Sequence, residues 1–227
     1  MTQLNIIVTG GFGELGTAVS QAFARNGHNV CRVDYASSPA TTIDHTLDLA
    51  GINLTKPLDS EKVASTVKST FGGIDVLVNI AGGFYWGNLD NSELSDWERM
   101  FGMNLLTAVS MTKAALPEIQ QSRSGRIINI GAIAALSADA GMGAYAASKS
   151  SIHRFTESLA KELSDSSTTV NAILPSTIDT KANRTAMPDA DTNSWVTPDA
   201  IADVILFLSS SAARSISGAL IPVSKGG

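Results

Sequence analysis

The chain has 227 residues, of which 44% are hydrophobic and 16% are charged, so one domain over residues 1–227 can bury an ample core. Its net charge of −5 and its lack of a basic cluster argue against a nucleic-acid partner, and its three histidines show no metal-ligand spacing. No apolar run reaches the roughly eighteen residues of a membrane span and the first residues do not form a signal peptide, so we expect a cytoplasmic protein without a membrane partner.

The first predicted elements are a strand over residues 4–9, a glycine-rich turn and a helix over residues 17–25. The turn reads Gly10-Gly-Phe-Gly13-Glu-Leu-Gly16. Glycines let the backbone approach a pyrophosphate closely, and the N-terminus of the following helix offers free N–H groups and a partial positive charge. Strand, turn and helix therefore predict the start of a dinucleotide-binding unit, although a glycine-rich loop without a ligand would share the local pattern.

The second predicted strand, residues 29–33, ends at Asp34, which lies 34 − 16 = 18 residues beyond Gly16. An acid at about that distance typically binds the ribose 2′-hydroxyl of NAD and repels the extra phosphate of NADP. No lysine or arginine lies in the glycine turn to offset this charge. Arg32 is close, but it alternates to the other face of the strand from Val33, which suits a structural role. The sequence therefore favours NADH over NADPH.

Strands continue to alternate with helices toward the C-terminus. We predict further strands over residues 42–48, 74–79, 126–130, 168–174 and 219–223, and helices over residues 58–71, 95–121, 143–163 and 198–209. Residues 74–79 form an apolar run of the kind that is buried on both faces of a sheet. This alternation implies an α/β fold with a doubly wound, mainly parallel seven-stranded sheet covered on both faces.

Tyr145 and Lys149 stand four residues apart at the start of the predicted helix over residues 143–163. Residues i and i+4 share one helix face, so the phenol and the ammonium can lie in one pocket. A free tyrosine ionises near pH 10, and a nearby cation would lower its pKa toward the range useful for proton transfer. An ordinary helix with one aromatic residue and one surface lysine would show the same spacing.

Five separated motifs together resemble the short-chain dehydrogenase/reductase family. They are the glycine turn at residues 9–16, Asn79-Ile-Ala-Gly82, Asn104, Tyr145-x-x-x-Lys149 and Pro175-x-x-x-x-Thr180. The resemblance runs nearly end to end. It implies a single-domain Rossmann fold and an NAD(P)-dependent oxidoreductase that acts on a small molecule and uses no metal. Family members are typically homodimers or homotetramers built on their long helices, which implies the same here.

The resemblance also implies roles for individual residues. Tyr145 would donate a proton, Lys149 would bind the nicotinamide ribose and lower the pKa of the tyrosine, and Asn104 would hold a water that links the lysine to solvent. The pyrophosphate would lie at the glycine turn, the adenosine near two acids, and the carboxamide after the sixth strand. The expected cofactor-binding residues, besides Tyr145 and Lys149, are Gly10, Gly13, Glu14, Leu15, Gly16, Asp34, Asp48, Leu49, Ala81, Gly82, Pro175 and Thr180.

Three positions depart from the family pattern. Glu14 occupies a slot that is usually glycine, and Ile80 replaces the second asparagine of the usual Asn-Asn-Ala-Gly. The family commonly places a serine thirteen residues before the tyrosine to bind the reacting carbonyl, and that position, 145 − 13 = 132, is an alanine. Ser137 is nearer the tyrosine and offers a partial substitute.

One branch of the family, dihydropteridine reductase, is similar in these departures and in the run Asn183-Arg-Thr-Ala-Met-Pro-Asp-Ala-Asp191. This likeness implies hydride transfer from NADH to quinonoid dihydropterin, whose ring can spread the developing charge without a serine. The expected substrate residues are Phe84, Tyr85, Trp86, Ala132 and Met187, although clustered aromatics also simply pack. The alternatives are a carbonyl reductase or alcohol dehydrogenase for a small ketone, sugar or acyl thioester, and a non-catalytic nucleotide-sensing module.

Overall fold

The computed structural model describes residues 3–225. Within that range seven strands form one sheet in the order β3-β2-β1-β4-β5-β6-β7. Every neighbouring pair is parallel, so the predicted doubly wound α/β sheet is confirmed, and it is parallel throughout rather than mainly so. The strands are β1 (Asn5–Thr9), β2 (Asn29–Val33), β3 (Thr46–Leu49), β4 (Val76–Asn79), β5 (Arg126–Ile130), β6 (Thr169–Pro175) and β7 (Leu220–Val223).

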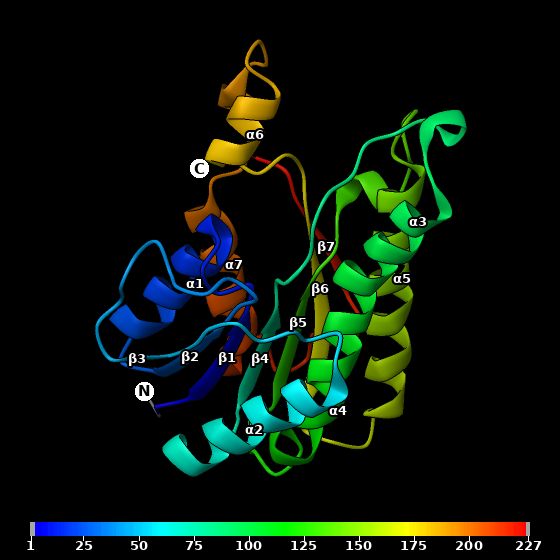
Figure 1. The fold of residues 1–227 in the computed structure, drawn as a ribbon. Helices are drawn as coiled ribbons and strands as arrows, with labels where there is room; N and C mark the ends of the chain where they lie inside the picture. The colour runs from blue at the N-terminus through cyan, green and yellow to red at the C-terminus, as the bar shows by residue number, and fades with distance from the viewer. Residues whose placement is uncertain (1–2, 226–227) are drawn as a thin grey trace.

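Helices cover both faces of the sheet (Figure 1). One face carries α1 (Glu14–Arg25) and α7 (Pro198–Ser209), and the other carries α2 (Pro57–Phe71), α4 (Thr107–Ile119) and α5 (Gly143–Glu162). Beyond the carboxyl ends of the strands lie α3 (Leu94–Phe101) and α6 (Lys181–Ala186). Single turns complete the chain at η1 (Leu89–Asn91), η3 (Ile133–Ala135), η4 (Thr192–Ser194) and η5 (Ser211–Ala213). None of the helices described in residues 3–225 is long and apolar enough to cross a membrane.

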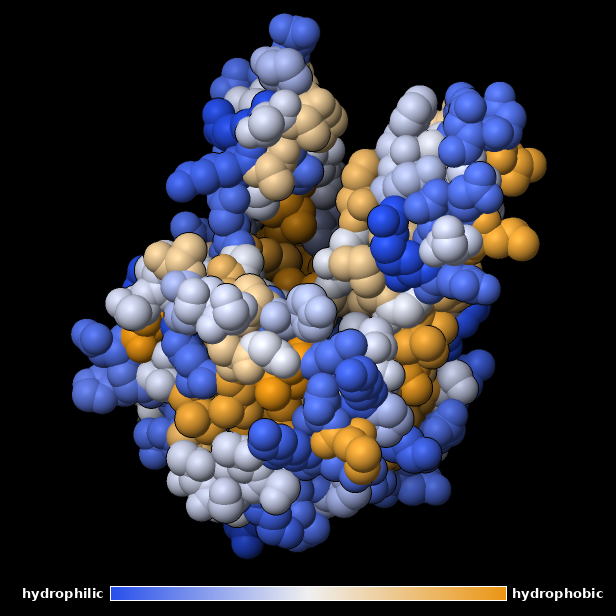
Figure 2. All heavy atoms as spheres, viewed as in Figure 1, coloured by the Kyte–Doolittle hydropathy of each residue, from blue (hydrophilic) through white to orange (hydrophobic). Residues whose placement is uncertain are grey.

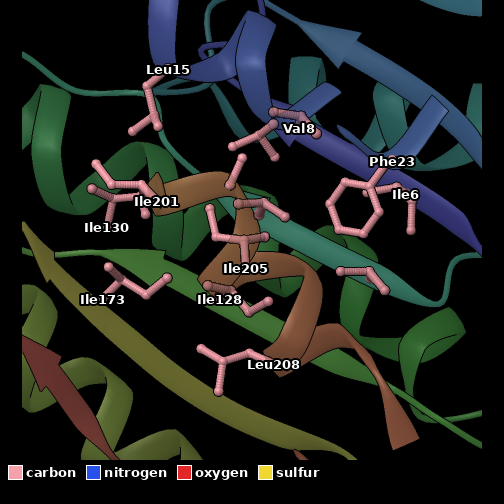
Figure 3. Close-up of a cluster of buried hydrophobic side chains, with 14 of the residues drawn as sticks. Ile6, Val8, Leu15, Phe23, Ile128, Ile130, Ile173, Ile201, Ile205 and Leu208 are labelled. Carbon is pink, nitrogen blue, oxygen red and sulfur yellow. The ribbon is translucent and has the colours of Figure 1, made fainter. Parts of the chain in front are cut away.

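Alternation of side chains along the strands produces two apolar cores. Ile6 and Val8 of β1 face α1 and α7, where Phe23 and Ile205 join them (Figure 3). Ile7, between them in the sequence, faces the opposite way into the core under α2 and α4. Each such side chain contributes roughly 1.5–3 kcal/mol when it is fully buried. Both faces of the sheet must therefore be covered, and the carboxyl edge remains free for a ligand.

Two predicted elements differ most from the structure. The strand expected at residues 42–48 begins only at Thr46, because residues 44–45 form a turn in which His45 has a φ of 62°. The helical region expected at residues 95–121 is a rod of three parts, in which a π-helical turn, η2 (Gly102–Leu106), joins α3 to α4. This turn carries Asn104, and such insertions into a helix frequently occur at functional sites.

Candidate active site

A cleft opens above the carboxyl ends of the strands, between the segment around α6 and the segment around α3 (Figure 2). In an open α/β sheet, ligands bind outside this edge at the point where the strand order reverses. Here that point lies between β1 and β4. The glycine turn follows β1 and the loop with Gly82 follows β4, so the topology brings these two predicted motifs together at the cleft.

The glycine turn is packed so closely that side chains are excluded at Gly10, Gly11 and Gly16. Gly10 has a φ of +63°, and a Cβ at Gly16 would lie only 2.1 Å from the carbonyl oxygen of Gly10. Gly13 lies in freer space, since its Cβ would meet nothing nearer than the same oxygen at 3.6 Å. Helix α1 starts at Glu14 without a side-chain cap, which leaves its first N–H groups available to an anion. The turn therefore fits a pyrophosphate, to which the buried Leu15 offers only its backbone.

Glu14 connects this turn to the opposite end of the sequence. Its Oε1 accepts a hydrogen bond from the backbone N–H of Lys181, the first residue of α6, at 2.9 Å. Thr180 caps the same helix, because its Oγ1 accepts from the backbone N–H of Asn183 at 3.2 Å. The Glu14 carboxylate, which stands where the family usually has glycine, thus binds the start of α6 beside the cleft. Sequence reasoning placed Glu14 and Thr180 at the cofactor but missed their contacts with α6.

The two acids expected near the adenosine have different partners. Both oxygens of Asp34 accept backbone N–H bonds, from Phe12 and Ala36, each at 3.0 Å. Asp48 instead binds the guanidinium of Arg32, with Nε 2.7 Å from Oδ1. Arg32 is 0% exposed, which fits the structural role expected for it. Asp34 stays a predicted ribose ligand, and the adenine role of Asp48, like that of the neighbouring Leu49, also stays a prediction.

Tyr145 and Lys149 both lie in the first half of α5, at its end nearest the cleft. Lys149 is 6% exposed and its Nζ donates to the carbonyl oxygen of Ile130 at 2.8 Å. Burial lowers the pKa of Lys149 to about 8 and raises the pKa of Tyr145 to about 12. The expectation that the lysine lowers the pKa of the phenol is therefore wrong for this structure, because desolvation of the phenolate is the larger effect. At neutral pH the phenol keeps its proton.

Asn104 is held by both ends of its amide. Its Oδ1 accepts from the backbone N–H of Gly83 at 2.9 Å, and its Nδ2 donates to the Oγ of Ser148 at 2.9 Å. A Cβ added at Gly82 would lie 2.5 Å from Oδ1 of Asn104 and 3.5 Å from Nζ of Lys149. The structure thus brings Asn104, Gly82 and Lys149 together, as the motifs predict. Ser148, which contacts Asn104, was missed by sequence reasoning. Its position immediately before Lys149 is the only sequence signal that could have indicated it.

The three consecutive aromatic residues point to different places. The Phe84 ring is 60% exposed and meets the Tyr145 ring edge-on, with 4.9 Å between centroids and 69° between planes. Trp86 donates from Nε1 to the carbonyl oxygen of Ala140 at 3.1 Å. The Tyr85 ring lies against Arg99 of α3, and a hydrogen bond to Asp96 raises its pKa. Phe84 is therefore the aromatic residue that the fold brings to the tyrosine.

The remaining predicted substrate and carboxamide residues lie at or just after the C-terminal ends of β5, β6 and α6. Ala132 is buried and contributes no hydroxyl, and Ser137 is exposed on the loop beyond it. Met187 follows the last residue of α6 and is exposed. Pro175 closes β6, and the next residue, Ser176, has a buried Oγ without a hydrogen-bond partner among the described residues. Ser176 was missed, and only its position after a strand at the carboxyl edge could have indicated it.

Comparison with known proteins agrees with this geometry. The family described as short chain dehydrogenase matches residues 4–191. The chain belongs to the short-chain dehydrogenase family. The resemblance seen in the motifs is thereby confirmed, and with it an oxidoreductase of a family that uses NAD(P).

Individual relatives match nearly the whole chain. The 3-oxoacyl-(acyl-carrier-protein) reductase of Vibrio cholerae is 30% identical, with 97% of this chain and 95% of that protein covered. The D-beta-hydroxybutyrate dehydrogenase of Cupriavidus necator is 28% identical, with 94% and 93% covered. Among solved structures, ligand-free aldohexose dehydrogenase of Thermoplasma acidophilum matches with a TM-score of 0.89 at 25% identity, with 97% and 92% covered. These likenesses establish the family and leave the substrate open.

Proposed function

We propose that the protein uses NADH to reduce a flat, electron-poor heterocycle of the quinonoid dihydropterin class, with Tyr145 as proton donor. The observation that carries this proposal is the exposed Phe84 ring set edge-on against Tyr145 at 4.9 Å. A planar heterocycle can stack on such a ring while its edge meets the phenol. A ketone would need a further donor for its oxygen as charge develops there, and Ala132 supplies no side-chain donor.

The residues around the cleft fit a dinucleotide. The free N–H groups at the start of α1 would hold the pyrophosphate, the Asp34 carboxylate the adenosine ribose, and Lys149 the nicotinamide ribose. Gly82 leaves room beside Lys149 that any side chain would fill. Thr180 and the backbone at Pro175 would orient the carboxamide. When bound, NADH supplies the hydride, and the protein supplies orientation and charge.

Tyr145 delivers the proton that balances this reaction. With a pKa of about 12, its phenol is protonated at neutral pH and can act as an acid. Lys149 follows Tyr145 by about one turn of α5, and its ammonium would favour the negative charge of the phenolate left behind. One hydride and one proton convert a quinonoid dihydropterin into a tetrahydropterin, and water then reprotonates the phenolate. Stabilising the phenolate is the same free-energy effect as lowering the pKa of the phenol, and in this structure burial outweighs it.

The second candidate is a reductase of small carbonyl compounds. It is favoured by the relatives, two of which are named as a 3-oxoacyl reductase and a hydroxybutyrate dehydrogenase. For this chemistry the residue that polarises the carbonyl must come from elsewhere, since residue 132 is alanine and Ser137 is exposed. A nucleotide-sensing module, the third alternative, would have no use for both Tyr145 and Lys149.

Steady-state oxidation of NADH separates the three functions. We expect kcat/KM for quinonoid dihydropterin to exceed that for an acetoacetyl thioester by about a hundredfold or more. Ala132→Ser is the matched variant, and it should improve thioester reduction while leaving pterin reduction within about threefold. Preferred turnover of the thioester by the wild-type protein would establish the carbonyl reductase instead. NADH binding without oxidation by either acceptor would support the sensing module.

A further inference from the structure

Arg32 is the only arginine or lysine in the sequence between Arg25 and Lys56, and it lies two residues before Asp34. Its side chain is 0% exposed. Charged side chains are almost never fully buried unless they are paired, and an unpaired buried charge is strongly destabilising. The buried guanidinium therefore needs a specific partner, close to the part of the site where the adenosine is expected.

Asp48 binds the guanidinium of Arg32 with both of its oxygens. Nε donates to Oδ1 at 2.7 Å, and Nη2 donates to Oδ2. The pairing register of β2 and β3 sets these two residues directly opposite each other. The remaining nitrogen, Nη1, donates to the carbonyl oxygen of Thr41 at 2.9 Å. A bidentate pair of this kind fixes orientation as well as charge, so the guanidinium is directed toward β3 and the loop before it.

Phe12 links this ion pair to the predicted ribose ligand. Its backbone N–H donates to Oδ2 of Asp34 at 3.0 Å, while its ring lies 5.3 Å from the Arg32 guanidinium. A Cβ at Gly11 would come within 2.7 Å of the Cβ of Arg32, so the glycine turn closes directly over the arginine. Phe12 thus contacts both the cation and Asp34, the residue that is expected to meet the 2′-position of the ribose. In sites of this type an arginine is what accommodates the 2′-phosphate of NADP.

We propose that Asp48 determines nucleotide specificity together with Asp34. Asp34 repels a 2′-phosphate, and Asp48 keeps Arg32 bound so that it does not attract one. The inference rests on the proposed use of NADH and adds a second carboxylate to it. The Asp48 side chain is 29% exposed and that of Arg32 is 0% exposed, so removing the charge of Asp48 leaves the guanidinium without its countercharge on the side of the pair that faces solvent.

Binding of two nucleotide fragments tests the proposal without turnover. 5′-AMP and 2′,5′-ADP (adenosine 2′,5′-bisphosphate) differ only in the 2′-phosphate, and calorimetry at fixed ionic strength gives their affinity ratio. We expect wild type to prefer 5′-AMP, and Asp48→Asn to raise the affinity for 2′,5′-ADP relative to that for 5′-AMP about tenfold. The ratio is the readout because loss of the predicted adenine contact of Asp48 weakens both fragments alike. Adding Arg32→Met to Asp48→Asn should abolish the gain. An unchanged ratio in Asp48→Asn, or a gain that persists without Arg32, overturns the proposal.

Arg32→Lys provides the measurement if loss of the countercharge prevents Asp48→Asn from folding. It keeps a cation beside Asp48 and loses the bidentate contact, so 2′,5′-ADP should bind about threefold more tightly than to wild type. No gain in a folded Arg32→Lys protein also overturns the proposal. Failure of pterin reduction would leave this ratio unaffected, and an unchanged ratio would leave pterin reduction unaffected, so the two failures are distinguishable.

Discussion

Among single residues, burial governs the ionisation of the two groups at the centre of the site. The pKa of Lys149 falls from 10.5 to about 8, and that of Tyr145 rises from 10.0 to about 12. Between pH 8 and 10.5 the folded protein thus binds fewer protons at Lys149 than the unfolded chain does, and this group makes stability rise with pH. For Tyr145 the sign is opposite, and stability falls as the pH rises from 10 to about 12.

Lys149→Met should therefore stabilise the protein at pH 7. The shift of the lysine's pKa from 10.5 to about 8 corresponds to a cost of roughly 3 kcal/mol in the wild type, and methionine avoids it. Urea denaturation at pH 7 and pH 9.5 measures the effect. The free energy of unfolding of the wild type should be higher at pH 9.5 than at pH 7, and Lys149→Met should not show this increase. Lys161→Met, an exposed lysine on the same helix, serves as the control. Equal pH dependence in Lys149→Met and wild type would contradict the account.

Tyr145→Phe isolates the hydroxyl from the ring. The variant keeps the packing against Phe84 and loses only the proton donor. We expect kcat with quinonoid dihydropterin to fall about a thousandfold, whereas the dissociation constant for NADH stays within about twofold. Stopped-flow turnover and quenching of protein fluorescence give the two quantities. A variant with nearly full kcat would show that another group donates the proton.

At the scale of elements, the stability of the glycine turn depends more on the close approach at Gly16 than on the number of its glycines. Gly16→Ala would place a Cβ 2.1 Å from a backbone oxygen, whereas Gly13→Ala would meet its nearest atom at 3.6 Å. We expect Gly16→Ala to lower the free energy of unfolding by about 2 kcal/mol, and Gly13→Ala by less than about 1 kcal/mol. Denaturant melts without nucleotide measure both. Equal losses would mean that the turn adjusts freely.

Local signals predicted some elements well and others poorly. β2, β5 and α7 have the bounds expected from their apolar runs and flanking residues, and Pro198 opens α7. The π-helical turn at Asn104 was missed because one wider turn hardly changes the apolar pattern of a long helix. α6 was missed because its first N–H is bound by Glu14, a residue remote in sequence.

For the molecule as a whole, the ordered motifs predicted the family, the sheet and the meeting of Gly82, Asn104 and Lys149 at one edge. They did not predict the Arg32–Asp48 pair, since the pairing register of β2 with β3 is set only in the folded sheet. Nor did they predict the rise in the pKa of Tyr145, because burial depends on which distant segments cover the phenol. The homodimer or homotetramer stays a prediction.

The central claim is that a neutral phenol at position 145 delivers a proton beside the hydride-bearing carbon of the nicotinamide. The most direct measurement is a crystal structure of the protein with NAD⁺ and an unreactive pterin. The account predicts the Tyr145 hydroxyl within about 3 Å of the pterin's accepting atom, the pterin stacked on Phe84, and Lys149 at the nicotinamide ribose. A hydroxyl turned away from that carbon, with the pterin bound elsewhere, would contradict it.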